Sequence, residues 1–168
     1  MNVIKIDASA LKEFSAAIGK AGAGLPKTYE EFLKKVGDDF LGLVRESIMQ
    51  MPVMDTRNLL HSFTKGSPGG VWALTHGNMT LEIGSVVDYA AYVNDGHWLN
   101  PTGVNERFVP GYWKGHHFVY DKSAKGGMML YQKWIPGKPY FDDAVTVAGW
   151  FIREKMYKML DDWIAKYF

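Results

Sequence analysis

The chain has 168 residues, a formal net charge of +1 and no cysteine. The length suits one domain, and the balanced charge gives no field that would select nucleic acid or an anionic membrane. Without cysteine, disulfides, thiolate nucleophiles and cysteine-ligated zinc are excluded. The N-terminus lacks signal-peptide features, and no run approaches the roughly eighteen apolar residues of a membrane span. These features predict a soluble protein of the cytosol.

The first third of the chain predicts two helices. Asp7 or Ser9 is a candidate cap for a first helix, which the glycines and Pro26 would end. Thr28 and Glu31 have the spacing of a capping box for a second helix, which should stop near Met49. Apolar residues at helical spacing define one face of each helix: Leu11, Phe14 and Ile18, then Phe32, Val36, Phe40, Val44 and Ile48.

The middle of the chain predicts strands and turns. Residues 59–65 favour a short strand or a half-turn, and 66–70 a turn or mobile loop. Residues 71–76 and 79–84 predict a hairpin around Gly77-Asn78, with Leu81 and Ile83 alternating with polar neighbours. Residues 88–94 are ambiguous between a helical turn and an extended segment.

The last part of the chain is rich in aromatic residues and glycine from Gly96 to Pro136. Residues 116–121 and 128–134 predict a second hairpin. Pro139 suits the first turn of a final helix, whose apolar face is Val145, Ala148, Ile152, Met156, Leu160 and Trp163. We therefore expect an α+β fold, with an antiparallel β-sheet packed against a long helix of the N-terminal half and a C-terminal helix, and an aromatic-rich β-hairpin insertion.

Three blocks of sequence share motif residues, from Pro52 and Asp55 through Tyr89 to Pro139, with a known family. They resemble bacteriophage neck and tail-completion proteins. The first block follows the long helix, the second lies in residues 87–96, and the third leads into the final helix through residues 136–144. The matching motif residues are Pro52, Asp55, Thr56, Leu59, Ser62, Tyr89, Tyr92, Gly96, Pro139 and Phe141. The resemblance makes 28–96 and 136–168 the family core of a single domain, 1–168, and makes 97–135 an insertion.

The resemblance implies a structural protein of the virion or of a tail-like particle, assembled in the bacterial cytoplasm. Such proteins form a homo-oligomeric, hexameric ring at the collar, which caps the tail tube and meets the connector or terminator. Two residues depart from the family pattern: Arg57 stands where glycine is usual, and Asn94 where glutamate is usual. Arg57 indicates that the backbone there need not be left-handed.

The aromatic residues of the insertion are the candidate interface, because tryptophan and tyrosine are enriched at protein contacts. They are Trp98, Phe108, Tyr112, Trp113, Phe118 and Trp134. An alternative is a carbohydrate (cell-wall) binding module, in which Trp98, Tyr112, Trp113 and Trp134 would stack on sugar rings.

Nothing in the sequence favours an enzyme. The five histidines form no metal-binding helical pair, and no catalytic elbow, phosphate loop or dinucleotide fingerprint is present. Because these motifs are missing, neither a catalytic residue nor a cofactor is expected. A metal site formed by His97, Asp95 and Glu106 stays an alternative.

Overall fold

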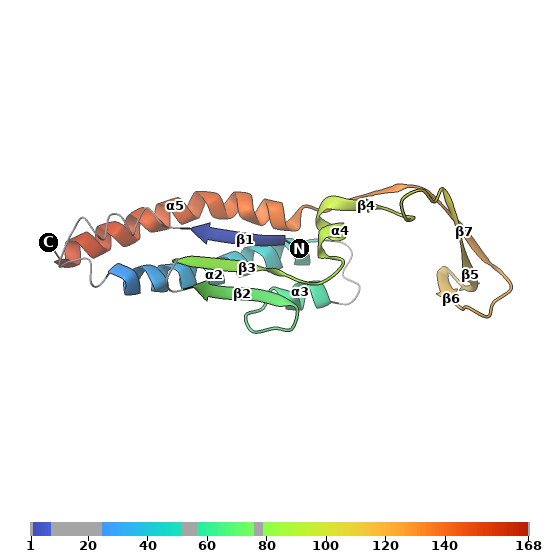
Figure 1. The fold of residues 1–168 in the computed structure, drawn as a ribbon, viewed down its shortest axis with the longest axis horizontal. Helices are drawn as coiled ribbons and strands as arrows, with labels where there is room; N and C mark the ends of the chain where they lie inside the picture. Colours follow the sequence, from blue (N-terminus) through green and yellow to red (C-terminus); the bar gives the residue numbers. More distant parts are fainter. Residues whose placement is uncertain (1, 8–24, 52–56, 76–78, 168) are drawn as a thin grey trace. The chain divides into compact units, whose positions relative to one another are not determined.

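A computed structural model describes residues 2–7, 25–51, 57–75 and 79–167 (Figure 1). The chain divides into two compact units. The core unit consists of Met1–Asn94 and Pro139–Phe168, and the insert unit is Asp95–Lys138. The α+β class is confirmed, whereas a single folding domain stays a prediction. The first predicted helix, with Leu11, Phe14 and Ile18, lies outside the described residues.

Helix α2 (Leu25–Met49) is the central element of the core unit. Its predicted apolar face is buried, and its predicted end near Met49 is confirmed. The capping box is wrong, since the helix begins three residues before Thr28. Pro26 therefore lies in the first turn of α2, where its missing amide proton costs no intrahelical hydrogen bond.

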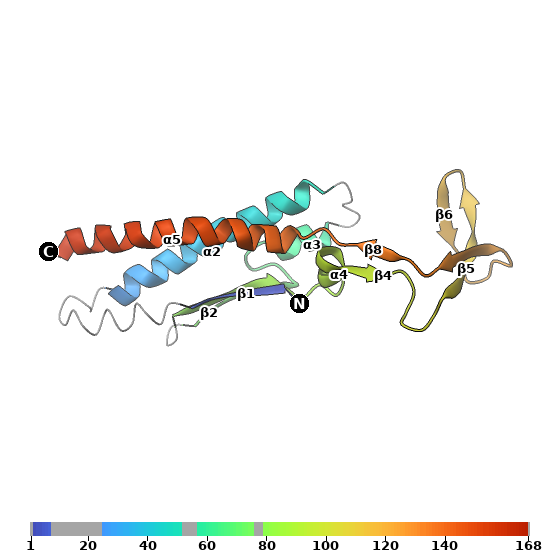
Figure 2. The ribbon, with the colours of Figure 1, turned by 90° about the horizontal axis from the view of Figure 1, so that it is seen from above.

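One face of α2 packs on a three-stranded antiparallel sheet in the order β1-β3-β2 (Figures 1 and 2). The strands are β1 (Asn2–Asp7), β2 (Gly70–Thr75) and β3 (Thr80–Ser85). The register pairs Trp72 with Ile83 and Leu74 with Leu81, so the predicted hairpin is confirmed. Helix and sheet approach closely at Gly37, because a Cβ there would lie 2.6 Å from the Trp72 ring.

Two short helices fill the end of the core unit. They are α3 (Asn58–Ser62) and α4 (Ala90–Asp95), so the ambiguous segment is helical. Of the two alternatives at residues 59–65, the short strand is wrong, because Asn58–Ser62 forms a helical turn. Leu59 and Phe63 are both buried, and in the observed helical turn their four-residue spacing puts them on one side. The Ser62 hydroxyl supports that turn by donating to the Leu59 carbonyl at 2.7 Å.

Arg57 begins helix α3 from a left-handed backbone conformation, with φ 57° and ψ 0°. The expectation that the backbone at Arg57 need not be left-handed is therefore wrong. The arginine has taken the conformation that a glycine would adopt without strain. Its carbonyl accepts a hydrogen bond from the His61 amide at 2.9 Å, which closes the first turn of the helix.

Helix α5 (Tyr140–Tyr167) closes the core unit by packing along α2 (Figure 2). Of its predicted apolar face, Ala148 and Trp163 are buried and the other four residues are partly buried against the core. Asp142 and Asp143 lie in its first turn, where negative charge interacts favourably with the helix dipole. Within the described ranges, no helix is both long and apolar enough to cross a membrane.

The insert unit contains five strands in two sheets. Strands β4 (Gly96–Trp98) and β8 (Trp134–Pro136) pair with each other. Strand β5 (Glu106–Lys114) lies between β6 (His117–Tyr120) and β7 (Gly127–Tyr131). The predicted pairing of residues 116–121 with 128–134 is wrong, because both segments pair with β5 instead. Strand β5 contains Pro110 and Gly111, which are unusual inside a strand, so the sequence pattern did not predict it.

Candidate assembly surface

The three motif blocks meet at one end of the core unit. Between the first and second blocks, the Tyr89 hydroxyl accepts a hydrogen bond from the Leu59 amide at 3.1 Å. Between the second and third, the Tyr140 hydroxyl donates to the Ala90 carbonyl at 3.3 Å. The Phe63 ring lies 6.0 Å from the rings of both Tyr140 and Phe141. The blocks therefore form one buried junction, although they are far apart in sequence.

Asn94 is the polar centre of this junction. Its side-chain oxygen accepts a hydrogen bond from the Phe141 amide at 3.0 Å, and its amide group donates to the Asp142 carboxylate at 2.8 Å. The first satisfies a backbone amide at the start of α5, which has no partner within its own helix. Glutamate, the usual family residue, can accept but cannot donate when ionised, so asparagine suits a position facing Asp142.

The other motif residues have separate surroundings. Pro52, Asp55 and Thr56 lie outside the described residues. Ser62 is buried and donates to Leu59, and its hydroxyl also bonds that of Ser85 at 2.8 Å. Tyr92 is 59% exposed, so it does not share the setting of Tyr89. The Pro139 carbonyl accepts the Asp143 amide at 2.9 Å in the first turn of α5.

The insert unit, which is described throughout, lacks a buried apolar core. Only Asn100 and Gly111 are buried in it. Its large apolar side chains are mostly exposed, by between 45% and 63% of their surface: Trp98, Phe108, Tyr112, Trp113, Tyr120, Met129, Tyr131 and Trp134. Such a density of exposed apolar surface on one small unit is typical of a protein-contact site.

Three of the aromatic rings cover glycines on paired strands. A Cβ on Gly111 would lie 2.6 Å from the Phe118 ring, and one on Gly127 would lie 2.6 Å from the Phe108 ring. Gly96 has a φ of 86°, and a Cβ there would lie 2.8 Å from the Trp134 ring. Contacts of a ring with a glycine backbone across a ladder thus replace the missing core.

Five of the six predicted interface residues are exposed, and they form separate groups. Trp98 and Trp134 are cross-strand partners whose rings make an edge contact at 5.4 Å. Trp113 makes an equivalent contact at 5.4 Å with Phe118, which is only half-exposed. Phe108 and Tyr112 lie at other points of β5. Sequence reasoning missed Tyr120, Met129 and Tyr131. For Met129 and Tyr131 the signal was the alternation of residues along β7.

Side-chain hydrogen bonds hold the turns of the insert unit. The Gln132 side chain accepts from the Asn100 amide at 2.9 Å and donates to the Asn100 carbonyl at 3.2 Å. Asn100 in turn donates to the Leu130 carbonyl at 2.9 Å. In the turn after β6, the Asp121 carboxyl accepts hydrogen bonds from Ser123. The bond from the Ser123 hydroxyl lowers the pKa of Asp121 most, and the bond from the Ser123 amide lowers it further.

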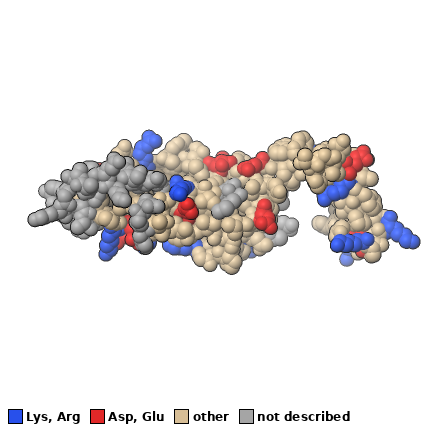
Figure 3. Space-filling view, viewed as in Figure 1, with Lys and Arg blue, Asp and Glu red and all other residues tan. Residues whose placement is uncertain are grey.

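Charge is distributed unevenly between the units. The insert unit contains six Lys or Arg residues and three Asp or Glu residues, a net charge of +3, whereas the whole chain carries +1. The remainder of the chain therefore carries −2. In Figure 3, Lys and Arg are prominent on the part of the surface that belongs to this unit. A partner of the insert unit should therefore present apolar and acidic groups together.

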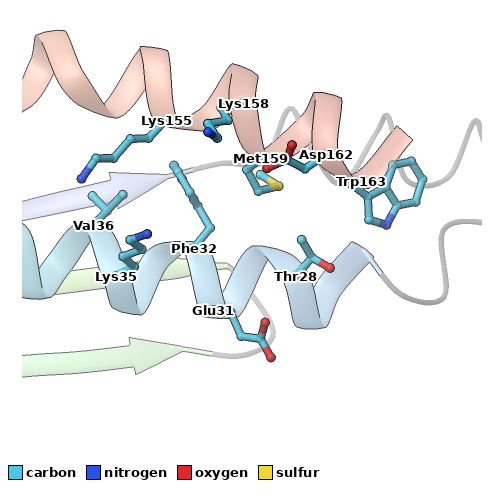
Figure 4. A pocket seen from close by; sticks show the side chains of 10 residues that line it. All are labelled: Thr28, Glu31, Phe32, Lys35, Val36, Lys155, Lys158, Met159, Asp162 and Trp163. Carbon is cyan, nitrogen blue, oxygen red and sulfur yellow. The ribbon is translucent and has the colours of Figure 1, made fainter. Parts of the chain in front are cut away.

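The core unit has a groove of about 540 Å³ between α2 and α5 (Figure 4). Phe32, Val36 and Met159 supply apolar surface. Its charged residues are of both signs, Glu31 and Asp162 with Lys35, Lys155 and Lys158. Lys155 forms an ion pair with Asp39 and lies over the Phe151 ring. The electrostatic potential of the groove is therefore neither uniformly positive nor uniformly negative.

The alternative metal site is not formed. Across the described ranges, no three His, Asp or Glu side chains come close enough to hold a metal ion, so His97, Asp95 and Glu106 do not converge. The structure thus offers an exposed aromatic surface in the insert unit and a buried junction in the core unit.

Comparison with known proteins agrees with this division. Residues 12–96 match the family described as "Bacteriophage HK97-gp10, putative tail-component". The match ends at residue 96, one residue after the insert unit begins. No solved structure matches the chain.

Two proteins of Bacillus subtilis (strain 168) are similar over almost their whole length. The "Phage-like element PBSX protein XkdI" is 36% identical over 157 residues, which are 93% of this chain and 96% of that protein. The "Uncharacterized protein YqbI" is 35% identical over 162 residues, 94% of this chain and 97% of that protein. Both alignments are too extensive to omit the insert unit. The chain belongs to the HK97-gp10-like family of bacteriophage tail components.

Proposed function

We propose that this protein is a neck or tail-completion component, which forms a ring that caps the tail tube and joins it to the connector or terminator. It acts in the virion or in a phage-like particle, and its role is assembly without catalysis. The family and the printed name of the PBSX relative support a place in a phage tail. The neck position and the hexameric ring are our extension of that finding.

The observation that carries the proposal is the exposed aromatic surface of the insert unit. Trp113 is 60% exposed and Tyr131 is 63% exposed. The unit has no apolar core that these side chains could fill. Burying these side chains against a partner stabilises a complex by about 25 cal/mol for each Å² of apolar surface removed from water. The positive charge of the unit adds a preference for a partner with an acidic surface.

The unit as a whole, Asp95–Lys138, is the proposed contact surface. Its predicted interface residues are Trp98, Phe108, Tyr112, Trp113, Phe118 and Trp134, to which the structure leads us to add Tyr120 and Tyr131. We propose that they bind a neighbouring protein of the neck or tail tube.

A truncation tests this proposal in the complete phage or element. Trp98 and Trp134 are paired at the end of the β4–β8 ladder, so Asn-Gly can join them directly in place of residues 99–133. Asn-Gly is favoured in two-residue hairpin turns, so the ladder should survive. The expected result is a folded protein with normal helix content in circular dichroism and particles whose tails stay unjoined or unterminated in electron micrographs.

Single substitutions provide a matched control. Trp113→Ser and Tyr131→Ser remove exposed aromatic surface from the insert unit, whereas Val86→Ser removes exposed apolar surface from the core unit and should leave particle completion normal. The first two should reduce the yield of complete particles. Normal completion by the folded truncated protein would overturn the proposal. Binding of the intact protein to cell-wall glycans, with normal assembly by the truncated one, would favour the carbohydrate-binding alternative instead.

A further inference from the structure

Helix α5 carries a second apolar face, which is exposed in the described part of the chain. Phe141, Ala144, Ala148 and Trp163 are buried in the core unit. Other large side chains of the same helix point to solvent. Their exposed fractions are 44% for Val147, 77% for Trp150, 59% for Tyr157 and 40% for Ile164. Trp150 is the most exposed large apolar residue of the described chain.

These residues belong to a regular stripe. With the exposed Glu154 and Asp161, they occur at alternating spacings of three and four residues, the spacing by which helices pack side by side. We call this set the α5 stripe: Val147, Trp150, Glu154, Tyr157, Asp161 and Ile164. It covers about 26 Å along the helix at 1.5 Å per residue. A stripe of this kind fits a second helix of similar length.

The order of residues in the stripe favours an antiparallel second copy. In that arrangement Val147 packs on Ile164 of the other chain, and Ile164 on its Val147. Glu154 then faces a Tyr157 hydroxyl, and Asp161 faces a Trp150 ring N–H, so that each carboxylate meets a hydrogen-bond donor. In a parallel pair of helices in register, Glu154 and Asp161 would each face their own copies, and like charges in contact destabilise pairing.

No ion pair within the described chain competes for these carboxylates, since neither Glu154 nor Asp161 forms one. Both ends of the paired stripe are apolar, which excludes water from the layers between them. The stripe is therefore complementary to itself in polarity and in hydrogen bonding.

We propose that the α5 stripe is a two-fold contact between two copies of this protein, with their α5 helices antiparallel. A two-fold contact uses the same patch on both chains and closes on itself, whereas a ring needs two different patches. The contact is therefore separate from the ring of the proposed neck function, and either can fail without the other.

Cysteine cross-linking tests the contact directly, because the chain has no native cysteine. Antiparallel pairing brings residue 147 of one copy beside residue 164 of the other. It leaves each residue about 25 Å from its own counterpart, seventeen residues along the helix. Mixing the V147C and I164C proteins under mild oxidation should therefore give a disulfide-linked dimer. Each variant alone should stay at least tenfold less cross-linked.

Sedimentation equilibrium provides the second measurement. Trp150→Ser should weaken the dimer at least tenfold, whereas Trp113→Ser in the insert unit should leave its dissociation constant unchanged. A monomeric native protein at all concentrations would overturn the proposal. So would efficient self-linking of I164C, which indicates parallel helices, or equal weakening by both serine variants.

Discussion

The core unit and the insert unit stabilise their folds in opposite ways. The core unit buries phenylalanine and leucine side chains between α2, α5 and a sheet, around the hydrogen bonds of Asn94. The insert unit buries only Asn100 and Gly111, and its rings lie over glycine backbone while much of their surface stays exposed. A packed interior makes a unit stable by itself, whereas exposed aromatic surface is useful when a partner covers it.

The largest expected effect contrasts one phenylalanine from each unit. Phe63 is fully buried against Tyr140 and Phe141, so Phe63→Ala should lower the free energy of unfolding by about 3–5 kcal/mol. Phe108 is 52% exposed, so Phe108→Ala should cost about 1 kcal/mol or less. Urea denaturation followed by helix circular dichroism measures the first change, and amide hydrogen exchange of strand β5 measures the second. Equal losses would contradict the contrast between the units.

Asn94→Asp sharpens the description of the junction. The change keeps the shape of the side chain, removes the donor to Asp142 and places two carboxylates together, so it should cost about 1–3 kcal/mol. Adding Asp142→Asn restores a donor opposite the new carboxylate and should recover much of that loss in thermal denaturation. A double variant no more stable than Asn94→Asp would show that this hydrogen bond does not matter.

Gly127→Ala tests the glycine contacts of the insert unit. The new methyl group would lie 2.2 Å from the Val109 carbonyl oxygen and 2.6 Å from the Phe108 ring, so β5 and β7 must separate. Amide protons of this ladder should exchange about tenfold faster, equivalent to roughly 1.4 kcal/mol, while those of α2 keep their rates. The neighbouring Gly126→Ala is the control, since its methyl group meets only the Gly111 oxygen, at 3.7 Å.

The smallest effect is expected at Arg57. A left-handed backbone is unfavourable for arginine, so Arg57→Gly should raise the free energy of unfolding by about 0.5–1 kcal/mol. At Asn58, one residue later and inside α3, glycine should destabilise by a similar amount. Thermal denaturation of the two variants compares them, and a loss of stability in Arg57→Gly would mean that the arginine side chain makes a contact worth more than the strain.

Periodicity explains which parts of the fold could be predicted. Helices α2 and α5 and the β2–β3 hairpin have regular apolar spacing, and the structure confirms them. Strand β1 was missed, although Ile4 and Ile6 alternate with Lys5, because its partner β3 is far away in sequence. Strand β5 was hidden by Pro110 and Gly111, and without it β6 and β7 were paired with each other.

The candidate surface was predictable in composition and less so in arrangement. A high density of aromatic residues marked the insertion, but only tertiary structure shows that Phe118 is partly covered while Tyr131 is exposed. The α5 stripe was missed because the helix also has a core-facing row, and the seven-residue interval between Trp150, Tyr157 and Ile164 was its signal. Arg57 shows the converse limit, since a residue type does not fix a backbone angle that a buried junction requires.

The β4–β8 ladder has a consequence for how such proteins can diversify. Gly96 and Pro136 are register partners, so the chain leaves and returns at a single pair of residues. What lies beyond that pair can lengthen, shorten or be exchanged at a small entropic cost, because loop-closure entropy grows only slowly with length. A protein that gained or lost the segment between Gly96 and Pro136 would keep the same core unit and would bind a different partner.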